Sequence, residues 1–375
     1  MSEYATSGVS HTSKDAGLSG LVRHLRGTLA NNPRAKVGAD HGYFASVVET
    51  EGSPLALAIS TDSVGTKVLV AQMAGKHDTV GIDCVAMNAN DVVCVGADPV
   101  TMVDYIGVNF VDAAIMEQLG KGLAEGARRA EISIPGGEIA QVRDLVKGFG
   151  DGCHYDLIGT CVGVVPKDRV SDGSACVAGD VVVGIASTGL HSNGLSLARR
   201  ILFETLKRDI HSELAECGRS VAEELLEPTG MYVRECKALQ RQGVPVHAMI
   251  NVTGGSFTNL LRVAAPGIGF HLDRLPEPQP IFRLLQDAGK VSDAEMHQVF
   301  NMGVGFALVV PESAVDACIA AAKAEGKAAQ AIGRVVVDPE KRLVISGAGK
   351  SKFLVGAKSK GELVVADGPP KGFPA

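Results

Sequence analysis

From Leu55 onward, short runs rich in Val and Ile alternate with longer stretches rich in Ala and Gly. Such runs of β-branched residues predict strands, whereas apolar positions three and four apart predict helices. In the first half of the chain we expect strands over 55–61, 68–73, 99–108 and 155–165, and helices over 79–95 and 113–130. This order predicts a mixed α/β domain over 37–166.

The same alternation restarts after residues 167–179, a polar and turn-rich segment that is typical of a linker. A second domain over 178–340 is predicted to contain strands over 180–186, 303–310 and 332–337, helices over 195–206, 232–241 and 314–325, and a short helix after Thr253. Residues 1–36 are predicted to form an N-terminal arm with a helix near 19–29, and residues 346–375 a flexible tail. The fold class is therefore α/β (α+β) with two domains.

Composition narrows the function. The chain has 36 basic and 42 acidic residues, a net charge of −6, and we see no basic run long enough to follow a nucleic-acid backbone. No apolar run approaches the ~18–20 residues of a membrane span, and the first residues do not resemble a signal peptide, so we expect a cytoplasmic protein. The eight Cys form no CxxC pair and are predicted to be buried. The 45 Gly exceed the roughly 26 expected from average usage, which indicates close backbone approaches.

Common nucleotide-binding signatures are absent. Gly349-Lys350-Ser351 imitates the end of a Walker A loop, but the position five residues before Gly349 is Val344 instead of Gly. The chemistry must therefore come from acidic and Gly-containing segments at the ends of elements. The first is 60–67, where a predicted strand runs through Asp62 into Gly65, Thr66 and Lys67. A carboxylate, a flexible turn and an ammonium suit Mg²⁺ with phosphate, although a turn with a solvated Lys explains them equally.

The predicted helix 79–95 carries Asp83 and Asn90 on nearly one face, with Asp91 one step around it. Acids on an otherwise apolar helix are expensive unless they are exposed or bind a cation. A solvent-exposed stripe is the alternative, but it would normally include Lys or Arg, and this helix has neither. A cation or nucleotide site is therefore one of two readings here.

Four further segments combine Gly with polar residues. Gly136 and Gly137 precede Glu138 at a predicted strand end, and residues 187–194 lead through His191 into a helix whose N-terminus is an anion site. The segments 251–255 and 300–305 repeat this pattern with Thr253, Gly254, Gly255 and Asn301. Each has an ordinary explanation, such as helix capping or an exposed turn, but together they predict a ligand site shared by both domains.

In order along the chain, these segments resemble the phosphoribosylformylglycinamidine cyclo-ligase family, also called AIR synthetases. The resemblance covers residues 14–333 and includes Gly-Leu-His191-Ser-Asn-Gly194 and Phe300-Asn-Met-Gly-Val-Gly305. It implies ATP-dependent ring closure of formylglycinamidine ribonucleotide in purine biosynthesis, with Mg²⁺ and, as a further candidate, K⁺. It also implies a homodimer whose N-terminal domains pair their sheets, and a C-terminal α/β sandwich.

The resemblance also implies roles for individual residues. Metal ligands would be Asp62, Asp83, Asp91 and Glu138; nucleotide contacts would be Lys14, Asp62, Gly65, Thr66, Asp91, Gly136 and Gly137. Substrate contacts would be Ser192, Asn193, Gly194, Thr253, Gly254, Gly255 and Asn301, and the catalytic residues would be Lys67 and His191. Lys67 would neutralise the transferring phosphoryl group, and His191 would be a base or an orienting group.

Three departures leave alternatives open. Ser63 replaces a Gly, the family's Thr-Ala-Glu after Gly-Gly-Glu is Ile-Ala-Gln141 here, and Asp40 and His41 interrupt a Gly-rich loop. The rivals are another enzyme of the same ATP-binding superfamily, such as a selenophosphate synthetase, a hydrogenase-maturation protein or a thiamine-phosphate kinase, and a catalytically silent nucleotide-binding paralogue. No Cys precedes Cys84, which argues against selenophosphate synthesis.

Overall fold

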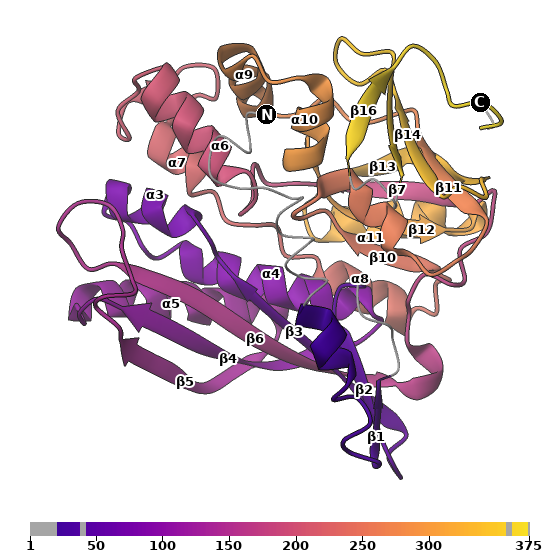
Figure 1. Ribbon diagram of the computed structural model, residues 1–375, viewed down its shortest axis with the longest axis horizontal. Helices are drawn as coiled ribbons and strands as arrows, with labels where there is room; N and C mark the ends of the chain where they lie inside the picture. The colour runs from indigo at the N-terminus through magenta and orange to yellow at the C-terminus, as the bar shows by residue number, and fades with distance from the viewer. Residues whose placement is uncertain (1–20, 38–42, 358–361, 374–375) are drawn as a thin grey trace.

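The computed structural model describes residues 21–37, 43–357 and 362–373. The chain forms two α/β bodies, each built on one main sheet (Figure 1). The first body lies in the lower half of the view, and the second, which contains the C-terminal strands, lies above it. The long helix α4 (Val80–Cys94) lies where the two bodies meet, because it contacts both the first sheet and strand β10 (Ala248–Asn251) of the second.

The first sheet has six strands. Their order across the sheet is β1 (Ala35–Val37), β2 (Ser46–Thr50), β3 (Leu55–Ser63), β6 (Tyr155–Pro166), β4 (Asp98–Val108) and β5 (Ser133–Gln141). Among the described pairings of this first sheet, only that of β4 with β5 is parallel. Helix α4 covers one face, and α5 (Ala113–Ala130) packs on α4. No element of the described residues covers the other face, which carries the partly exposed Leu55, Leu57, Val103 and Tyr105; we call this face of the first sheet the open face.

Helices α4 and α5 approach one another closely because three of the residues at their contact are glycines. A Cβ built on Gly126 of α5 would lie 2.9 Å from Cβ of Val85, and one on Gly122 would lie 3.1 Å from Cα of Gly81. Side chains at these positions would push the helices apart. Part of the glycine surplus therefore serves helix packing.

The second sheet has eight strands. Their order is β10, β12 (Val304–Val310), β7 (Val181–Ala186), β13 (Ala329–Val337), β11 (Ile268–Leu272), β14 (Arg342–Ser346), β15 (Phe353–Ala357) and β16 (Leu363–Ala366). The helices of this domain are α6 (Leu195–Arg199) with its π-helical continuation η2 (Arg200–Thr205), α7 (Val221–Leu225), α8 (Val233–Arg241), η3 (Ser256–Arg262), α9 (Pro280–Gly289), α10 (Asp293–Val299) and α11 (Val315–Ala324). Small elements complete it: η1 (Lys167–Arg169), η4 (Glu312–Ala314) and the hairpin of β8 (Glu213–Leu214) with β9 (Arg219–Ser220).

Two sequence-based expectations differ from the structure. Residues 68–73 were expected to form a strand but lie in helix α3 (Lys67–Ala74), because a short apolar run fits a buried helix as well as a strand. Residues after Ser346 were expected to form a flexible tail, yet β15 and β16 extend the second sheet. The loop between β14 and β15 is held by Asp293, whose Oδ2 accepts hydrogen bonds from the backbone N–H groups of Lys350 and Ser351.

Other expectations fit the structure. The predicted strands and helices over 79–130 and 155–186 appear with small boundary shifts, and residues 21–26 of the arm are helical. Seven of the eight cysteines are buried, and Cys217 is partly exposed. Among the described residues, we find no helix with the length and apolar composition to cross a membrane.

Candidate functional site between the domains

A buried cluster of polar residues connects the two domains. Lys67, at the start of α3, places its ammonium 2.9 Å from Oδ1 of Asp83 on α4, and both side chains are 0% exposed. The same Oδ1 accepts hydrogen bonds from the backbone N–H and the hydroxyl of Thr229, at 2.7 and 2.6 Å. Lys67 also donates to the carbonyl oxygen of Glu227 at 2.6 Å. We call these four residues the interdomain clasp.

The clasp is an enclosed arrangement. Its charges have no solvent contact, so the ion pair depends on the hydrogen bonds that surround it. Oδ2 of Asp83 has no hydrogen-bond partner among the described residues. Two predicted site residues, Lys67 and Asp83, are therefore brought together, but they bind each other and the 227–229 segment.

A second interdomain contact involves Asp91, which lies about two helical turns after Asp83 on α4. Its Oδ1 accepts a hydrogen bond of 2.8 Å from the amide of Asn251, at the end of β10. The pKa of Asp91 is raised to about 7: burial raises it most and the negative charge of Asp62 adds to this, whereas the hydrogen bond from Asn251 and the charge of Arg262 partly offset the rise. Asp62 and Asp91 thus lie near enough to repel one another, and a cation bound nearby would relieve that repulsion.

Neighbouring Asn90 also reaches the second domain. Its side-chain amide donates to the carbonyl of Gly230 at 2.8 Å, and its side-chain oxygen accepts from the backbone N–H of Tyr232 at 2.9 Å. Asn90 therefore fixes the segment that follows the clasp. The face of α4 that the sequence marked as polar is buried against the other domain instead of facing solvent.

His191 is buried within its loop. Its backbone has a φ of +61°, and its Nε2 lies 3.2 Å from the backbone N–H groups of both Thr188 and Gly230. Burial, aided by the charge of Lys67, lowers the pKa of His191 to about 3. The ring is therefore neutral at pH 7 and its Nε2 lone pair is already engaged. In this conformation His191 orients the loop through these two hydrogen bonds, and its role in the reaction, as a base or as an orienting group, stays a prediction.

The other residues of the second domain meet around the same loop. The hydroxyl of Ser192 lies 3.0 Å from the hydroxyl of Thr229, so Ser192 contacts the clasp. The side-chain amide of Asn301 donates to the carbonyl of Gly189 at 2.8 Å, and its oxygen accepts from the backbone N–H of Gly303, so Asn301 holds the 187–194 loop in place. Gly194 has a φ of +77°, and a side chain there would strike Phe300. Gly254 faces the side chain of Asn193, since a Cβ built on it would lie 3.4 Å from Oδ1 of Asn193.

Gly65 and Thr66 lie at the domain boundary, because Oγ1 of Thr66 is 3.2 Å from Oγ of Ser196 on α6. Thr253 and Gly255 frame the turn into η3, where Gly255 has a φ of +95° and Oγ1 of Thr253 is 3.4 Å from the amide of Asn259. Gly65 and Thr66 therefore lie at the same interdomain boundary as the clasp, whereas Thr253 and Gly255 are positioned by contacts within the second domain, just after Asn251.

Glu138 stands apart from the other predicted ligands. It is exposed and pairs in register with Tyr105, so it belongs to the open face of the first sheet. Its neighbour Gly137 pairs with Asp104 of β4, and Asp104 in turn pairs with Gly159 of β6. Gly159 also pairs with Asp62 of β3, so Asp62 and Asp104 lie on the face of the sheet that α4 covers. The structure of a single chain therefore does not bring Glu138 to Asp62 and Asp91. Gly136 lies beside it in open space.

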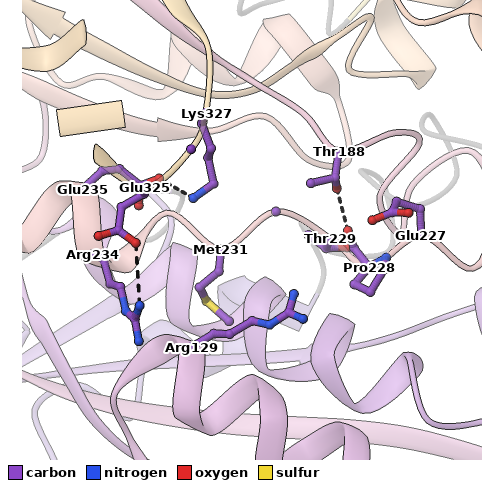
Figure 2. Close-up of a pocket in the computed structure, with 12 residues that line it drawn as sticks. Arg129, Thr188, Glu227, Pro228, Thr229, Met231, Arg234, Glu235, Glu325 and Lys327 are labelled. Carbon is purple, nitrogen blue, oxygen red and sulfur yellow. Dashed lines mark hydrogen bonds and ion pairs between the residues drawn. The ribbon is translucent and has the colours of Figure 1, made fainter. Parts of the chain in front are cut away.

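A cavity of about 340 Å³ lies beside the 227–231 segment, between α5 and the second domain (Figure 2). Its charged lining residues largely pair with one another. Lys327 binds Glu235, and Arg234 lies 3.7 Å from Glu325. None of the predicted site residues lines this cavity, but Glu227 and Thr229 of the clasp do, so the cavity adjoins the clasp.

The donors at the boundary suit Mg²⁺ only in part. Asp62 and Asp91 supply hard oxygen ligands, and Mg²⁺ in proteins is commonly held by one or two carboxylates together with phosphate oxygens. Within the described ranges no group of three or more His, Cys, Asp or Glu side chains is arranged to hold a metal by itself. The residues therefore fit a metal that arrives with a phosphorylated ligand, and not a metal enclosed by protein alone.

The sequence did not indicate the partners of the predicted site residues. Thr229, Glu227 and Asn251 complete the contacts of Lys67, Asp83 and Asp91, but nothing in their local pattern indicates a partner more than a hundred residues away. Lys14, Asp40 and His41 lie outside the described residues.

Comparison with solved structures identifies the class of fold. A thiamine-monophosphate kinase from Stenotrophomonas maltophilia matches with a TM-score of 0.59 and 18% identity, over 88% of this chain and 96% of that one. AaThiL complexed with AMPPCP and TMP matches with a TM-score of 0.58 and 16% identity, over 89% and 95%. The hydrogenase maturation protein HypE in complex with ATP gives 0.55 and 18%, over 89% and 92%. The chain thus has the two-domain AIR-synthetase-like fold.

Sequence comparison then identifies the family. Residues 42–165 match the N-terminal domain, and residues 177–346 the C-terminal domain, of the AIR synthase related proteins, and the chain belongs to this family. It is 43% identical to the phosphoribosylformylglycinamidine cyclo-ligase of Methanocaldococcus jannaschii over 337 residues, which cover 90% of this chain and 93% of that protein. The identically named protein of Thermococcus kodakarensis is 43% identical over 314 residues, or 83% and 89%.

Proposed function

We propose that the protein catalyses the ATP-dependent cyclisation of formylglycinamidine ribonucleotide to aminoimidazole ribonucleotide in purine biosynthesis. The observation that carries the proposal is the 43% identity to a cyclo-ligase over nearly the full length of both chains. The pair of carboxylates, Asp62 and Asp91, at the boundary between the domains supports it. The sequence comparison favours this enzyme over the kinase and maturation branches, whose structures share only the fold at 16–18% identity.

In this reaction the γ-phosphoryl group of ATP is transferred to the formyl oxygen, which becomes a good leaving group. An amidine nitrogen attacks the formyl carbon, phosphate departs with the oxygen, and the nitrogen loses a proton. Such transfers depend mainly on positioning and on charge neutralisation. Asp62 and Asp91 would hold Mg²⁺, which would neutralise phosphate charge, and Gly65 and Thr66 would approach the nucleotide phosphates. K⁺ is a further candidate ion.

The second domain would bind the substrate. Ser192, Asn193 and Gly194, with Thr253, Gly254 and Gly255, lie on two loops at the boundary, and Asn301 supports the first of them. His191 would orient this loop. A role of Lys67 in neutralising the transferring phosphoryl group requires the clasp to open, because its ammonium is bound to Asp83 and Glu227. Lys14 is proposed to contact the nucleotide.

The open face of the first sheet supports a homodimer. Leu55 is 41%, Leu57 39% and Val103 45% exposed, which is unusual for neighbouring large apolar residues on a sheet. Pairing of two such faces would bury them, as the resemblance implies. Glu138 and the strand carrying Gly136 and Gly137 lie on or beside this face, so a partner chain would bring them to its interface.

The direct test uses purified protein with formylglycinamidine ribonucleotide, ATP, Mg²⁺ and K⁺, with detection of the aminoimidazole product and of ADP. We expect both products in equal amounts. Asp91→Asn should abolish turnover while its circular dichroism stays unchanged, whereas Asp316→Asn, on the exposed surface of α11, should behave as wild type. ATP binding without any aminoimidazole product would instead favour a silent paralogue. ADP formation with a different phosphate acceptor would favour another enzyme of the superfamily.

A further inference from the structure

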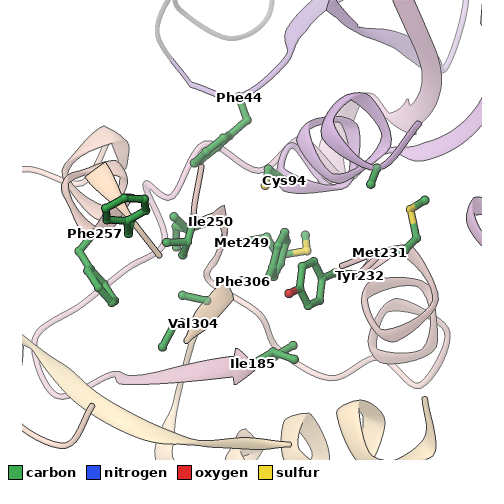
Figure 3. Close-up of a cluster of buried hydrophobic side chains, with 14 of the residues drawn as sticks. Phe44, Cys94, Ile185, Met231, Tyr232, Met249, Ile250, Phe257, Val304 and Phe306 are labelled. Carbon is green, nitrogen blue, oxygen red and sulfur yellow. The ribbon is translucent and has the colours of Figure 1, made fainter. Parts of the chain in front are cut away.

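Arg262, the last residue of η3, lies where the first domain docks onto the second. The carbon at the centre of its guanidinium is 4.9 Å from the centre of the Phe44 ring. Phe44 belongs to the first domain and is buried, and the hydroxyl of adjacent Tyr43 donates to the carbonyl of Met249. Figure 3 shows Phe44 reaching toward Ile250 and Phe257 of the second domain. The planar cation is therefore held at the boundary by stacking.

The guanidinium lies within electrostatic range of the carboxylates of the site. It is attracted to Asp91 most strongly, and also to Asp62. Yet no carboxylate lies within ion-pair distance of Arg262, and no acceptor forms a hydrogen bond with its guanidinium, anywhere in the part of the chain that the structure describes. A guanidinium has five N–H donors in a fixed planar fork. A partly buried cation whose donors are unused, beside two carboxylates that suit a metal, has the chemistry of an anion site.

We propose that Arg262 binds phosphate oxygens of the ligand held between the domains. In the structure its charge balances that of Asp62 and Asp91. When a metal and a phosphorylated ligand occupy the carboxylates, the guanidinium donates to the phosphate from the side of the second domain. This inference rests on the proposed function for the identity of the ligands, but the anion site itself requires only a phosphate group.

Two sources could supply that phosphate: the polyphosphate of the nucleotide and the monoester of the ribonucleotide substrate. The same chemistry suits both, because Arg pairs with phosphate through two parallel hydrogen bonds in either case. The experiment therefore has one arm for each. The nucleotide arm measures binding of the magnesium complex of AMPPNP by calorimetry, and the substrate arm measures KM for formylglycinamidine ribonucleotide.

Three variants separate charge from packing. Arg262→Gln removes the charge and keeps part of the stem, and Arg262→Lys keeps the charge but loses the fork. Arg274→Gln is the matched control, because Arg274 is a largely exposed arginine of the same domain, next to Asp273. Thermal unfolding of each variant reports any loss of packing against Phe44.

We expect Arg262→Gln either to weaken the binding of AMPPNP or to raise the KM for formylglycinamidine ribonucleotide, by about tenfold or more. This is the loss typical of a hydrogen bond to a charged group. Arg262→Lys should recover part of that loss, and Arg274→Gln should match wild type. If the affinity of Arg262→Gln for AMPPNP and its KM for formylglycinamidine ribonucleotide both stay within twofold of wild type, the inference is wrong and Arg262 only packs between the two domains. If the wild type forms no aminoimidazole but binds AMPPNP, and Arg262→Gln weakens that binding, the anion site stands although the proposed function fails.

Discussion

Variants of the clasp give the sharpest prediction, because they distinguish a Lys67 that acts on the ligand from a Lys67 that holds the domains together. Lys67→Met keeps the length of the side chain and removes the ammonium. Asp83 then stays 0% exposed with only Thr229 as its partner, and the carbonyl of Glu227 loses its donor. Removing one member of a buried ion pair typically costs about 3–5 kcal/mol. A protein whose stability lies near the middle of the ordinary range, roughly 10 kcal/mol, still folds after that loss.

The double variant Lys67→Met/Asp83→Asn removes both charges. The amide introduced by Asp83→Asn would keep a side-chain oxygen that can accept from Thr229, so we expect the free energy of unfolding to recover by about 1–3 kcal/mol relative to the sum of the two single variants. Urea unfolding followed by circular dichroism measures this coupling. The ATP-dependent formation of product is measured on the same samples.

The two measurements together test the reasoning. If Lys67 acts by holding the domains, stability and kcat/KM should recover together in the double variant. If the single variants each lose less than about 1 kcal/mol, the clasp is not the stabilising contact that its geometry indicates. If the double variant is stable but its turnover stays as low as that of Lys67→Met, the ammonium acts on the transferring phosphoryl group instead.

Three other predictions address separate features. Leu57→Glu on the open face should convert a dimer to a monomer in light scattering, whereas Leu145→Glu, whose parent side chain is 82% exposed, should not; an unchanged mass for Leu57→Glu would contradict the proposed interface. His191 has a folded pKa of about 3, below its unfolded value near 6.5, so the unfolded state binds more protons and stability falls as pH is lowered from about 7.5 to 5.5, by about 1.4 kcal/mol from this residue. His191→Gln should remove that part of the slope in urea unfolding, and an unchanged slope would refute the assignment. Gly126→Ala should destabilise by about 1–3 kcal/mol because of Val85, whereas Gly120→Ala on the same helix, with nothing within 4 Å of its Cβ, should be neutral or stabilising; equal thermal midpoints would count against the close helix contact.

Much of the fold could be predicted from the pattern of apolar residues, because strands such as β6 and helices such as α5 have strong periodicity. The region 68–73 could not, since six apolar-rich residues do not distinguish a buried helix from a strand. The strands β15 and β16 were missed because Gly, Lys and Pro around them suggested a tail, whereas alternating Leu354 and Gly356 face the core of the sheet.

The site was predictable to the extent that it is local in sequence. Asp62, Asp83, Asp91 and the 191–194 loop do lie at one boundary, as the motif pattern indicated. Which of them bind one another depends on contacts across more than a hundred residues, such as Asp83 with Thr229. Such contacts leave no periodic signal, and neither does the docking of Phe44 on Arg262.

The glycine contact between α4 and α5 also limits how this enzyme can vary. The helix that carries Asp83, Asn90 and Asp91 is wedged between α5, the first sheet and the second domain. It can neither slide nor rotate without a collision at Gly81, Gly122 or Gly126. Changes that alter substrate preference would therefore be tolerated mainly in the loops of the second domain. The carboxylates on α4 would keep their positions while the sequences of those loops change.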